Sequence, residues 1–175
     1  SDTLAPGWRC TVFVLHLGLP AATVQWLQHG LDLPNVTLQC IHLGGACSAA
    51  QALQTRAHYS PEMYLRLWIP ELLSVYPKLI YLDADVVVCR SLHYLYAVDV
   101  SPWDVAGVLD PNNQGHKAYV EQQLQVAAEQ YVNSGVLIFN TANCRAHQFR
   151  SRCFAVLAAH EGLNCPDQDM INVAC

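Results

Sequence analysis

The sequence predicts an α/β fold, a three-layer sandwich built around a mostly parallel sheet. Strand-like and helix-like segments alternate along all 175 residues, which is the order typical of such sheets. The composition agrees, because 53% of the residues are hydrophobic and only 13% are charged. A chain of this length and composition is expected to form one domain with a large core, taken here to span residues 1–175.

The first elements predict one βαβ unit. Thr11–His16 is rich in β-branched and aromatic residues, as buried strands are, and Asn35–His42 alternates apolar and polar residues. Between them, Ala21–His29 has apolar residues at helical spacing. A unit of this kind joins its strands by a right-handed crossover, so we expect these two strands to be parallel neighbours.

The rest of the chain continues the alternation without an internal repeat. A helix is expected after the N-cap residue Ser60, with Pro61 at its first position, a kink near Pro70 and an end at about Val75. The later elements are expected as a strand over Lys78–Val88, a helix over Lys117–Gln130, a strand over Gly135–Asn140, a helix over Arg145–His160 and a last helix over Pro166–Ile171.

Charge and cysteine content limit the function classes. The formal net charge is −5 and the basic residues are scattered, so no nucleic-acid partner is expected. The chain has no apolar run of about 18 residues, so we expect no transmembrane segment, while peripheral membrane association and an oligomer stay open. The start, Ser1–Arg9, does not resemble a signal peptide, which favours the cytoplasm, including the inner face of the membrane, over the secretory lumen. The 8 cysteines form no C-x-x-C pair, and both thiols and disulfides stay open.

Two aspartates interrupt the apolar strand expected over Lys78–Val88. Asp83 and Asp85 are two residues apart, so on an extended segment their carboxylates point to the same side. Like charges this close repel one another unless a cation lies between them, and hard divalent cations take oxygen ligands of this type. The carboxyl end of a strand is also where open α/β sheets bind ligands. We therefore favour a metal site over the alternative, in which Asp83 caps a turn and Asp85 faces water.

A strand that ends in D-x-D is also typical of haloacid-dehalogenase-like phosphohydrolases. In those enzymes the first aspartate is a nucleophile and the second a general acid, and here Lys117 with Asp167 or Asp169 would fill the later roles. Their motif normally lies near the start of the chain, whereas here it follows a complete βαβ unit and a long helix. This is the less favoured alternative.

Several motifs occur in one order along the chain. Tyr64-Leu65-Arg66-Leu67 comes first, then Leu79-Ile80-Tyr81-Leu82-Asp83-Ala84-Asp85, Asn133-Ser134-Gly135-Val136 and Asp167-Gln168-Asp169. In this order the chain resembles glycosyltransferase family 8, retaining enzymes that include lipopolysaccharide galactosyl- and glucosyltransferases and glycogenin. The resemblance runs from about Cys10 to Cys175. It implies the GT-A fold, which is Rossmann-like, and a hexosyltransferase that uses UDP-Gal or UDP-Glc as donor and a saccharide or lipopolysaccharide as acceptor.

The resemblance also implies ligands for the donor. Asp83 and Asp85 would bind Mn²⁺ (or Mg²⁺) together with the diphosphate of the UDP-sugar, and the metal would act as a Lewis acid toward the leaving UDP. The backbone around Ala84 would lie against the ribose or uracil. Arg66 would point toward the donor sugar and Asp83; the alternative is a surface ion pair.

The remaining motif residues would surround the sugar. Asn133 and Ser134 would border it, unless Asn133 only caps the turn before its strand. Asp167 would hold sugar hydroxyls, with the alternative that it is only a helix N-cap. Gln168 would lie near the β-face of the anomeric carbon. Because an amide is a poor nucleophile, we favour front-face transfer with Gln168 as a stabilising group.

Two departures from the family pattern affect the expectation. Family members have a nucleotide-binding strand about 30 residues before the position of Cys10, and a histidine that supplies a third metal ligand on a C-terminal segment. Neither has a counterpart in this sequence. We therefore expect a partial or degenerate catalytic domain, and a non-catalytic binding module derived from a transferase is the alternative function.

Overall fold

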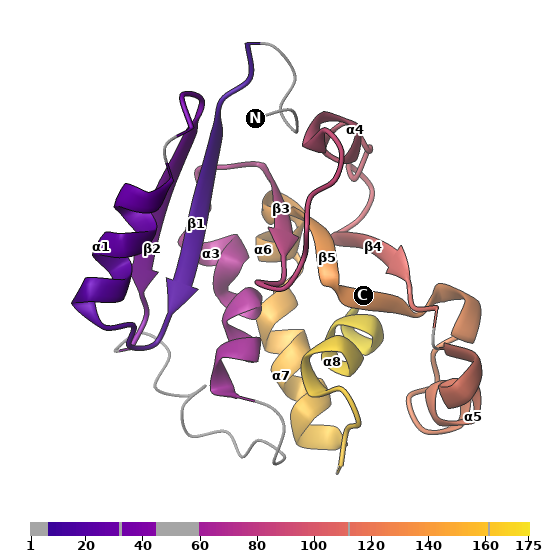
Figure 1. The fold of residues 1–175 in the computed structure, drawn as a ribbon. Helices are drawn as coiled ribbons and strands as arrows, with labels where there is room; N and C mark the ends of the chain where they lie inside the picture. Colours follow the sequence, from indigo (N-terminus) through magenta and orange to yellow (C-terminus); the bar gives the residue numbers. More distant parts are fainter. Residues whose placement is uncertain (1–6, 32, 45–59, 112, 161) are drawn as a thin grey trace. The chain divides into compact units, whose positions relative to one another are not determined.

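The computed structural model describes residues 7–31, 33–44, 60–111, 113–160 and 162–175 (Figure 1). The chain divides into two compact units. The first comprises Ser1–Leu65 and Val88–Leu95, and the second comprises Arg66–Val87 and Tyr96–Cys175. The single catalytic domain expected over residues 1–175 stays a prediction, and each unit is described by itself.

The first unit contains the βαβ motif that the sequence predicts. Strand β1 (Cys10–His16) is followed by helix α1 (Ala21–Gly30) and strand β2 (Val36–His42). The strands pair in parallel, in a register that joins Cys10 to Val36 and His16 to His42 (Figure 1). The prediction is confirmed for all three elements, because apolar periodicity of this kind is a local property that the sequence shows directly.

The second unit is built on a three-stranded sheet. Its strands are β3 (Lys78–Leu82), β4 (Val105–Leu109) and β5 (Val132–Asn140), in the order β3-β5-β4. Both outer strands run antiparallel to β5, so the expected parallel pairing holds for β1 and β2 but not for this sheet. The central strand contains the buried core residues Leu137, Ile138 and Phe139.

Strand β4 was not predicted from the sequence. It is short, it contains Gly107, and its end is exposed, so it has little of the apolar pattern of a buried strand. The glycine provides space: a Cβ at Gly107 would lie 3.0 Å from atoms of both Leu137 and Val132 on the neighbouring strand. Close approach of β4 to β5 therefore requires a residue without a side chain here.

The helix expected from Ser60 to Val75 is two shorter helices. A 3₁₀ segment, η1, spans Pro61–Trp68, and helix α3 (Ile69–Leu72) follows it. The expected kink at Pro70 is instead the beginning of a new helix, because proline is tolerated in the first turn, where its missing N–H has no partner to lose. Arg66 lies in the last part of η1, which belongs to the second unit.

The remaining helices of the second unit differ from the predictions mainly at their ends. A left-handed Gln148 (φ 55°) divides the helix expected over Arg145–His160 into two. A second left-handed residue, Gln125 (φ 57°), lies in the helix expected over Lys117–Gln130. The observed elements are α5 (Asn113–Gln122), η2 (Ala128–Gln130), α6 (Thr141–Ala146), α7 (Phe149–Ala159) and α8 (Pro166–Ala174). A short helix, α4 (Leu92–Tyr96), most of which belongs to the first unit, was not predicted.

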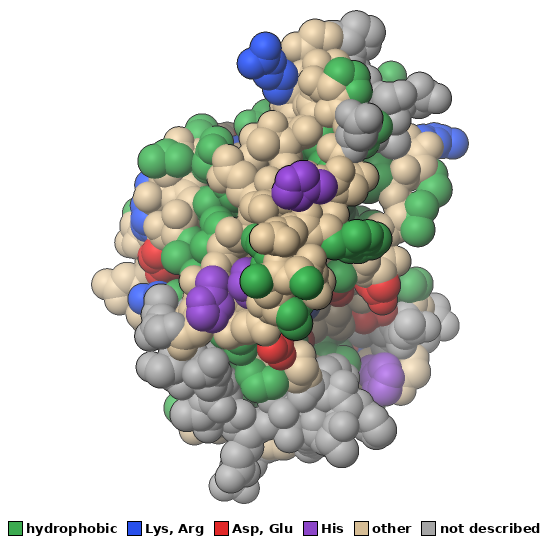
Figure 2. All heavy atoms as spheres, turned by 60° about the vertical axis from the view of Figure 1, so that its left-hand side comes forward, with side chains coloured by type: hydrophobic (Ala, Val, Ile, Leu, Met, Phe, Trp, Pro, Cys, Tyr) green, Lys and Arg blue, Asp and Glu red, His purple; other side chains and the backbone are tan. Residues whose placement is uncertain are grey.

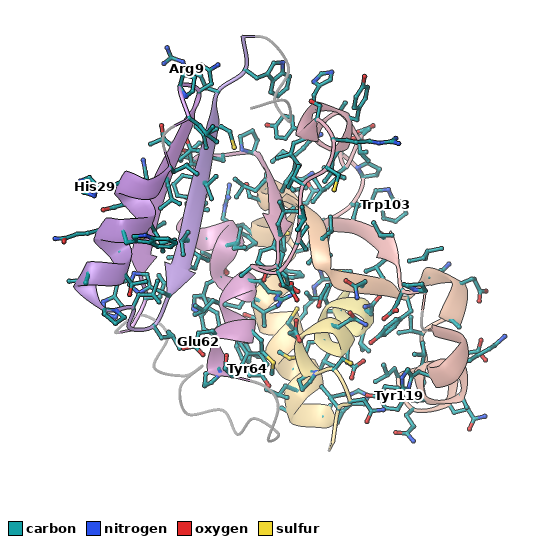
Figure 3. The ribbon with its side chains drawn as sticks, in the orientation of Figure 1. Arg9, His29, Glu62, Tyr64, Trp103 and Tyr119 are labelled. Atoms are coloured by element: carbon teal, nitrogen blue, oxygen red, sulfur yellow. The ribbon has the colours of Figure 1, made fainter. Side chains whose placement is uncertain are left out.

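Aromatic packing contributes to the core of the second unit. Phe139 and Phe149 meet edge to face with ring centroids 5.8 Å apart, and Trp68 and Phe154 do so at 5.3 Å. At the surface, Trp103 before β4 is 63% exposed (Figure 3). On the face shown in Figure 2, scattered apolar side chains outnumber charged ones, in agreement with the low charged fraction. No helix in the described ranges has the length and apolar content needed to cross a membrane.

Candidate active site

The chain turns at Asp83 instead of continuing as a strand. The backbone N–H of Asp83 donates to the Gly135 carbonyl at 2.9 Å, and the Asp83 carbonyl accepts from the N–H of Val86 at 3.1 Å. The strand expected over Lys78–Val88 is therefore too long, and its last part is not buried, since Val87 is 80% exposed. The three valines resemble a strand in the sequence, but the turn takes them out of the sheet.

The two candidate metal ligands lie in different environments. The Asp83 side chain is 33% exposed, whereas Asp85 and Ala84 are exposed residues of the turn. The expected extended segment, which would place both carboxylates on one side, is wrong because residues 84–85 form this turn. Both aspartates nevertheless follow the carboxyl end of β3 directly, as the sequence predicts.

Arg66 connects Asp83 with the beginning of α8. Its side chain is only 7% exposed, and it forms ion pairs with Asp83 at 3.0 Å and with Asp167 at 3.1 Å. It also donates to the Ser134 carbonyl at 2.8 Å, and its guanidinium lies 4.6 Å from the centroid of the Tyr81 ring. The alternative of a surface ion pair is therefore wrong. The four groups around Arg66 come from β3, β5 and α8, or from the turn directly after β3.

The first turn of α8 carries the other candidate residues. Asp167 accepts a hydrogen bond from the Ser134 hydroxyl at 3.0 Å, and the side-chain oxygen of Gln168 accepts from the Ser134 N–H at 2.9 Å. The Gln168 amide nitrogen donates to Asp110 at 2.8 Å. Asp167 is not the N-cap of this helix; that position belongs to Cys165.

Burial determines the protonation behaviour of Asp167. Removal from water raises the pKa of this carboxyl, and the Arg66 guanidinium and the Ser134 hydroxyl partly oppose that effect. The net direction is upward because desolvation is the largest influence. Arg66 therefore favours the ionised form of Asp167, against the effect of burial.

Asn133 makes a local hydrogen bond inside its strand, not in a turn before it. Its side-chain oxygen accepts from the Gly135 N–H at 2.8 Å, and both residues lie inside β5, which begins earlier than expected. A Cβ at Gly135 would lie 3.0 Å from the Asn133 oxygen and 3.0 Å from Oδ2 of Asp83. A glycine is therefore needed where the turn after β3 crosses β5.

Three supporting interactions of this site are not predicted from the sequence. Asp110 fixes the amide of Gln168, and Tyr81 donates to Asp83 at 2.6 Å. Asp169 is fully buried, and its carboxylate accepts from Tyr131 at 2.5 Å, from Tyr119 at 2.6 Å and from the Cys165 N–H at 3.0 Å. A signal existed for Asp169, since a buried acidic residue in a first helical turn requires donors. Asp110 had no such signal.

A cavity of about 40 Å³ lies between Gln168 and this tyrosine pair. Asp110 and His116 also line it. Its volume suits water molecules rather than a sugar. A sugar is therefore not accommodated in this cavity, and the exposed side of the Asp83 turn is the accessible part of the site.

The phosphohydrolase alternative requires residues that are engaged elsewhere. Lys117 is 61% exposed on α5 and pairs with Glu121 at 3.5 Å, one turn away along the same helix. Asp169 is held by two tyrosines, and Asp167 by Arg66 and Ser134. The described residues therefore do not place a lysine and a free acidic pair beside Asp83.

The donor set at the turn suits a hard divalent cation in part. Oδ1 of Asp83 accepts from Tyr81, whereas Oδ2 accepts no hydrogen bond from the residues described, and Asp85 is exposed. Carboxylate oxygens of this kind are typical ligands of Mg²⁺ and Mn²⁺, which keep other positions for phosphate and water. Within the described ranges, no three His, Cys, Asp or Glu side chains form a group that holds a metal by itself.

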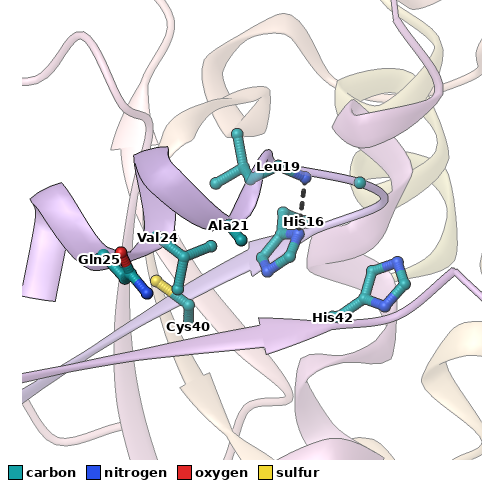
Figure 4. A pocket seen from close by; sticks show the side chains of 8 residues that line it. His16, Leu19, Ala21, Val24, Gln25, Cys40 and His42 are labelled. Carbon is teal, nitrogen blue, oxygen red and sulfur yellow. Dashed lines mark hydrogen bonds between the residues drawn. The ribbon is translucent and has the colours of Figure 1, made fainter.

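A separate pocket of about 450 Å³ lies in the first unit, at the carboxyl ends of β1 and β2 (Figure 4). His16 and His42 line it with stacked rings whose centroids are 5.2 Å apart. Nδ1 of His16 accepts from the Leu19 N–H at 3.0 Å, so the neutral ring carries its proton on Nε2. Burial, with a smaller effect of His42, lowers the pKa of His16.

Comparison with known families gives a match over most of the chain. The model of one family, described as glycosyl transferase family 8, matches residues 24–175. The chain belongs to that family. Two solved structures share its fold. One is the bifunctional glycosyltransferase WbbM in its apo form, with a TM-score of 0.81 and 24% identity. The other is the galactosyltransferase LgtC in complex with donor and acceptor sugar analogs, with a TM-score of 0.78 and 23% identity. The match with WbbM covers 98% of this chain and 33% of WbbM. The match with LgtC covers 96% of this chain and 60% of LgtC. The GT-A fold is thereby confirmed.

Curated relatives of this family 8 chain include a lipopolysaccharide glucosyltransferase and a general stress protein. Lipopolysaccharide glucosyltransferase WaaO of Escherichia coli (strain K12) is 30% identical over 129 residues, which are 70% of this chain and 38% of WaaO. General stress protein A of Bacillus subtilis (strain 168) is 26% identical over 117 residues, 66% of this chain and 38% of that protein. The chain thus spans well under half the length of these relatives.

Proposed function

We propose that this protein takes part in the transfer of a hexose from UDP-Gal or UDP-Glc, with retention, to a saccharide or lipopolysaccharide acceptor. The observation that carries the proposal is the Arg66 bridge, because one buried guanidinium holds the candidate metal ligand Asp83 and the candidate sugar ligand Asp167 together. The relatives support the substrate class: WaaO is a lipopolysaccharide glucosyltransferase, and LgtC was solved with donor and acceptor sugar analogs.

The residues of the turn bind the diphosphate end of the donor. Asp83 and Asp85 hold Mn²⁺ or Mg²⁺, and the backbone at Ala84 lies against the nucleoside. The cation supplies Lewis-acid stabilisation of the negative charge that develops on the departing UDP. Arg66 keeps the Asp83 carboxylate in place and compensates its charge, so the guanidinium acts as a support rather than as a direct ligand of the sugar.

The residues of α8 and β5 act on the sugar itself. Asp167 accepts hydrogen bonds from sugar hydroxyls, Asn133 and Ser134 border the ring, and Gln168 faces the anomeric carbon. The Gln168 amide is fixed at both ends, by the Ser134 N–H and by Asp110, so its orientation is set before the donor arrives. A preorganised amide dipole stabilises an oxocarbenium-like state without becoming a nucleophile.

Binding measurements test the proposal directly. Calorimetry of UDP in Mn²⁺ should give a clear affinity that EDTA abolishes, and Asp85→Asn should remove the metal-dependent part. The matched control is Asp99→Asn, an exposed aspartate whose contact is a local hydrogen bond to the Ser101 N–H. Equal affinity for UDP in Mn²⁺ and in EDTA would contradict the proposal. A screen of UDP-sugars for release of UDP then identifies the donor.

A non-catalytic, transferase-derived binding module is the second candidate. It is favoured by the described metal ligands, since two carboxylates rather than a complete set of three stand at the turn. This candidate predicts Mn²⁺-dependent UDP binding without sugar transfer or UDP-sugar hydrolysis at any metal concentration. A cytoplasmic location at the inner membrane face belongs to the first candidate, and fractionation of cells that express the protein tests it.

A further inference from the structure

The two oxygens of the Asp83 carboxylate have different surroundings. Oδ1 accepts a 2.6 Å hydrogen bond from the Tyr81 hydroxyl and lies 3.0 Å from Nη2 of Arg66. Oδ2 accepts no hydrogen bond from the part of the chain that the structure describes. With one third of the side chain exposed, the carboxylate is accessible from solvent. The protein therefore occupies one oxygen and leaves the other for an external ligand.

Tyr81 is suited to hold this orientation. It lies on β3, two residues before Asp83, and Arg66 packs over its ring, so both its position and its ring plane are constrained. Its hydroxyl donates to Oδ1 of Asp83 at 2.6 Å, so Tyr81 serves as a hydrogen-bond donor that fixes one oxygen of the carboxylate.

Gly135 limits the same carboxylate from the other side. Its carbonyl accepts from the Asp83 N–H at 2.9 Å, which fixes the backbone of the turn to β5. A Cβ on Gly135 would lie 3.0 Å from Oδ2 of Asp83, closer than carbon and oxygen ordinarily approach. Gly135 does not have a positive φ, so a glycine is needed here for the close approach of Asp83 and not for an unusual backbone conformation.

We propose that Tyr81 and Gly135 are positioning residues that present Oδ2 of Asp83 to the divalent cation of the donor complex. Tyr81 and Arg66 hold Oδ1, so the carboxylate cannot rotate to exchange its oxygens, and Gly135 leaves the space in which Oδ2 lies. The inference rests on the proposed function, because it takes Asp83 as a metal ligand. Partners that orient a ligating carboxylate in this way typically change metal affinity about 10- to 100-fold when they are removed.

The first variant distinguishes the effect of the Tyr81 hydroxyl from that of its ring. Tyr81→Phe keeps the ring under Arg66 and removes only the donor to Oδ1. In saturating UDP, the affinity for Mn²⁺, followed by the electron paramagnetic resonance signal of the free ion, should fall about 10-fold or more. In EDTA, neither the wild type nor Tyr81→Phe should bind UDP. Tyr94→Phe is the matched control, since Tyr94 is 76% exposed, and it should bind Mn²⁺ as the wild type does.

A second pair of variants tests the space at β5. Gly135→Ala should also weaken Mn²⁺ binding about 10-fold or more, because the new methyl group displaces Oδ2. Gly115→Ala is its control, since nothing lies within 4 Å of a Cβ at that position. Urea unfolding of each variant shows that it is folded before its affinity is measured, and if either Tyr81→Phe or Gly135→Ala fails to fold, the other decides the question.

A double-mutant cycle with Asp83, the proposed metal ligand, distinguishes positioning from general destabilisation. In an Asp83→Asn background, Tyr81→Phe should cause no further loss of Mn²⁺ affinity, because there is no carboxylate left to orient. Equal Mn²⁺ affinity of the wild type and Tyr81→Phe, or a full additional loss in Asp83→Asn, would overturn the inference. If the wild type binds no Mn²⁺ in the presence of UDP, the proposed function itself fails.

Discussion

Replacement of Arg66 by methionine is the most informative perturbation of stability. Arg66→Met keeps much of the side-chain length and removes the charge that joins two aspartates. Asp83 is 33% exposed and regains part of its hydration, whereas Asp167 is 8% exposed and loses its ion pair in a buried place. A buried charge left without its partner destabilises a protein by about 3–5 kcal/mol. We therefore expect the free energy of unfolding to fall by about this amount, mainly through Asp167.

The dependence on pH gives the same experiment a second readout. Burial raises the pKa of Asp167, and Arg66 opposes that rise, so the pKa should be higher still in Arg66→Met. A carboxyl whose pKa is raised on folding favours the folded state at low pH and loses that effect as the pH rises from its unfolded pKa to its folded pKa. The variant should therefore be closest to the wild type near pH 5 and furthest from it near pH 8.

Urea unfolding at both pH values measures these differences. Arg150→Met is the matched control, because Arg150 is 36% exposed and its ion pair with Glu71 spans 3.5 Å; it should change stability by less than about 1 kcal/mol. Asp167→Asn in the Arg66→Met background should restore part of the loss, since it removes the unpaired charge. A loss below about 1 kcal/mol in Arg66→Met, or a loss that is the same at pH 5 and pH 8, would refute the reasoning.

Further predictions concern other buried groups. Tyr131→Phe should destabilise the protein by about 1.5–3 kcal/mol in urea unfolding, because it removes a hydrogen bond to the buried Asp169 carboxylate; a loss near zero would contradict this. The pKa of His16 is lowered by burial, so stability should decrease as the pH falls through its unfolded pKa of about 6.5, and His16→Gln should reduce that dependence. Cys89 is exposed, whereas burial raises the pKa of the Cys153 thiol, so mass spectrometry after brief alkylation should find Cys89 modified and Cys153 intact.

The sequence by itself determined the elements with strong local periodicity and the family. The βαβ unit over β1, α1 and β2 was predicted almost to its ends, because apolar spacing is local information. The candidate residues of the motifs, from Arg66 to Gln168, were also visible as a set in sequence order. Several contacts of this set are made in the structure: Arg66 meets Asp83 and Asp167, and Ser134 meets Gln168.

The tertiary structure alone decided strand direction and the supporting residues. The antiparallel pairing of β3 and β4 with β5 depends on how connections return to the sheet, and the short exposed β4 has no pattern to reveal it. Asp110 meets Gln168 across 58 residues, and Gly135 limits Asp83 only because the turn after β3 crosses β5. Periodicity describes neighbours along the chain, whereas the orientation of the Asp83 carboxylate depends on groups that only folding brings together.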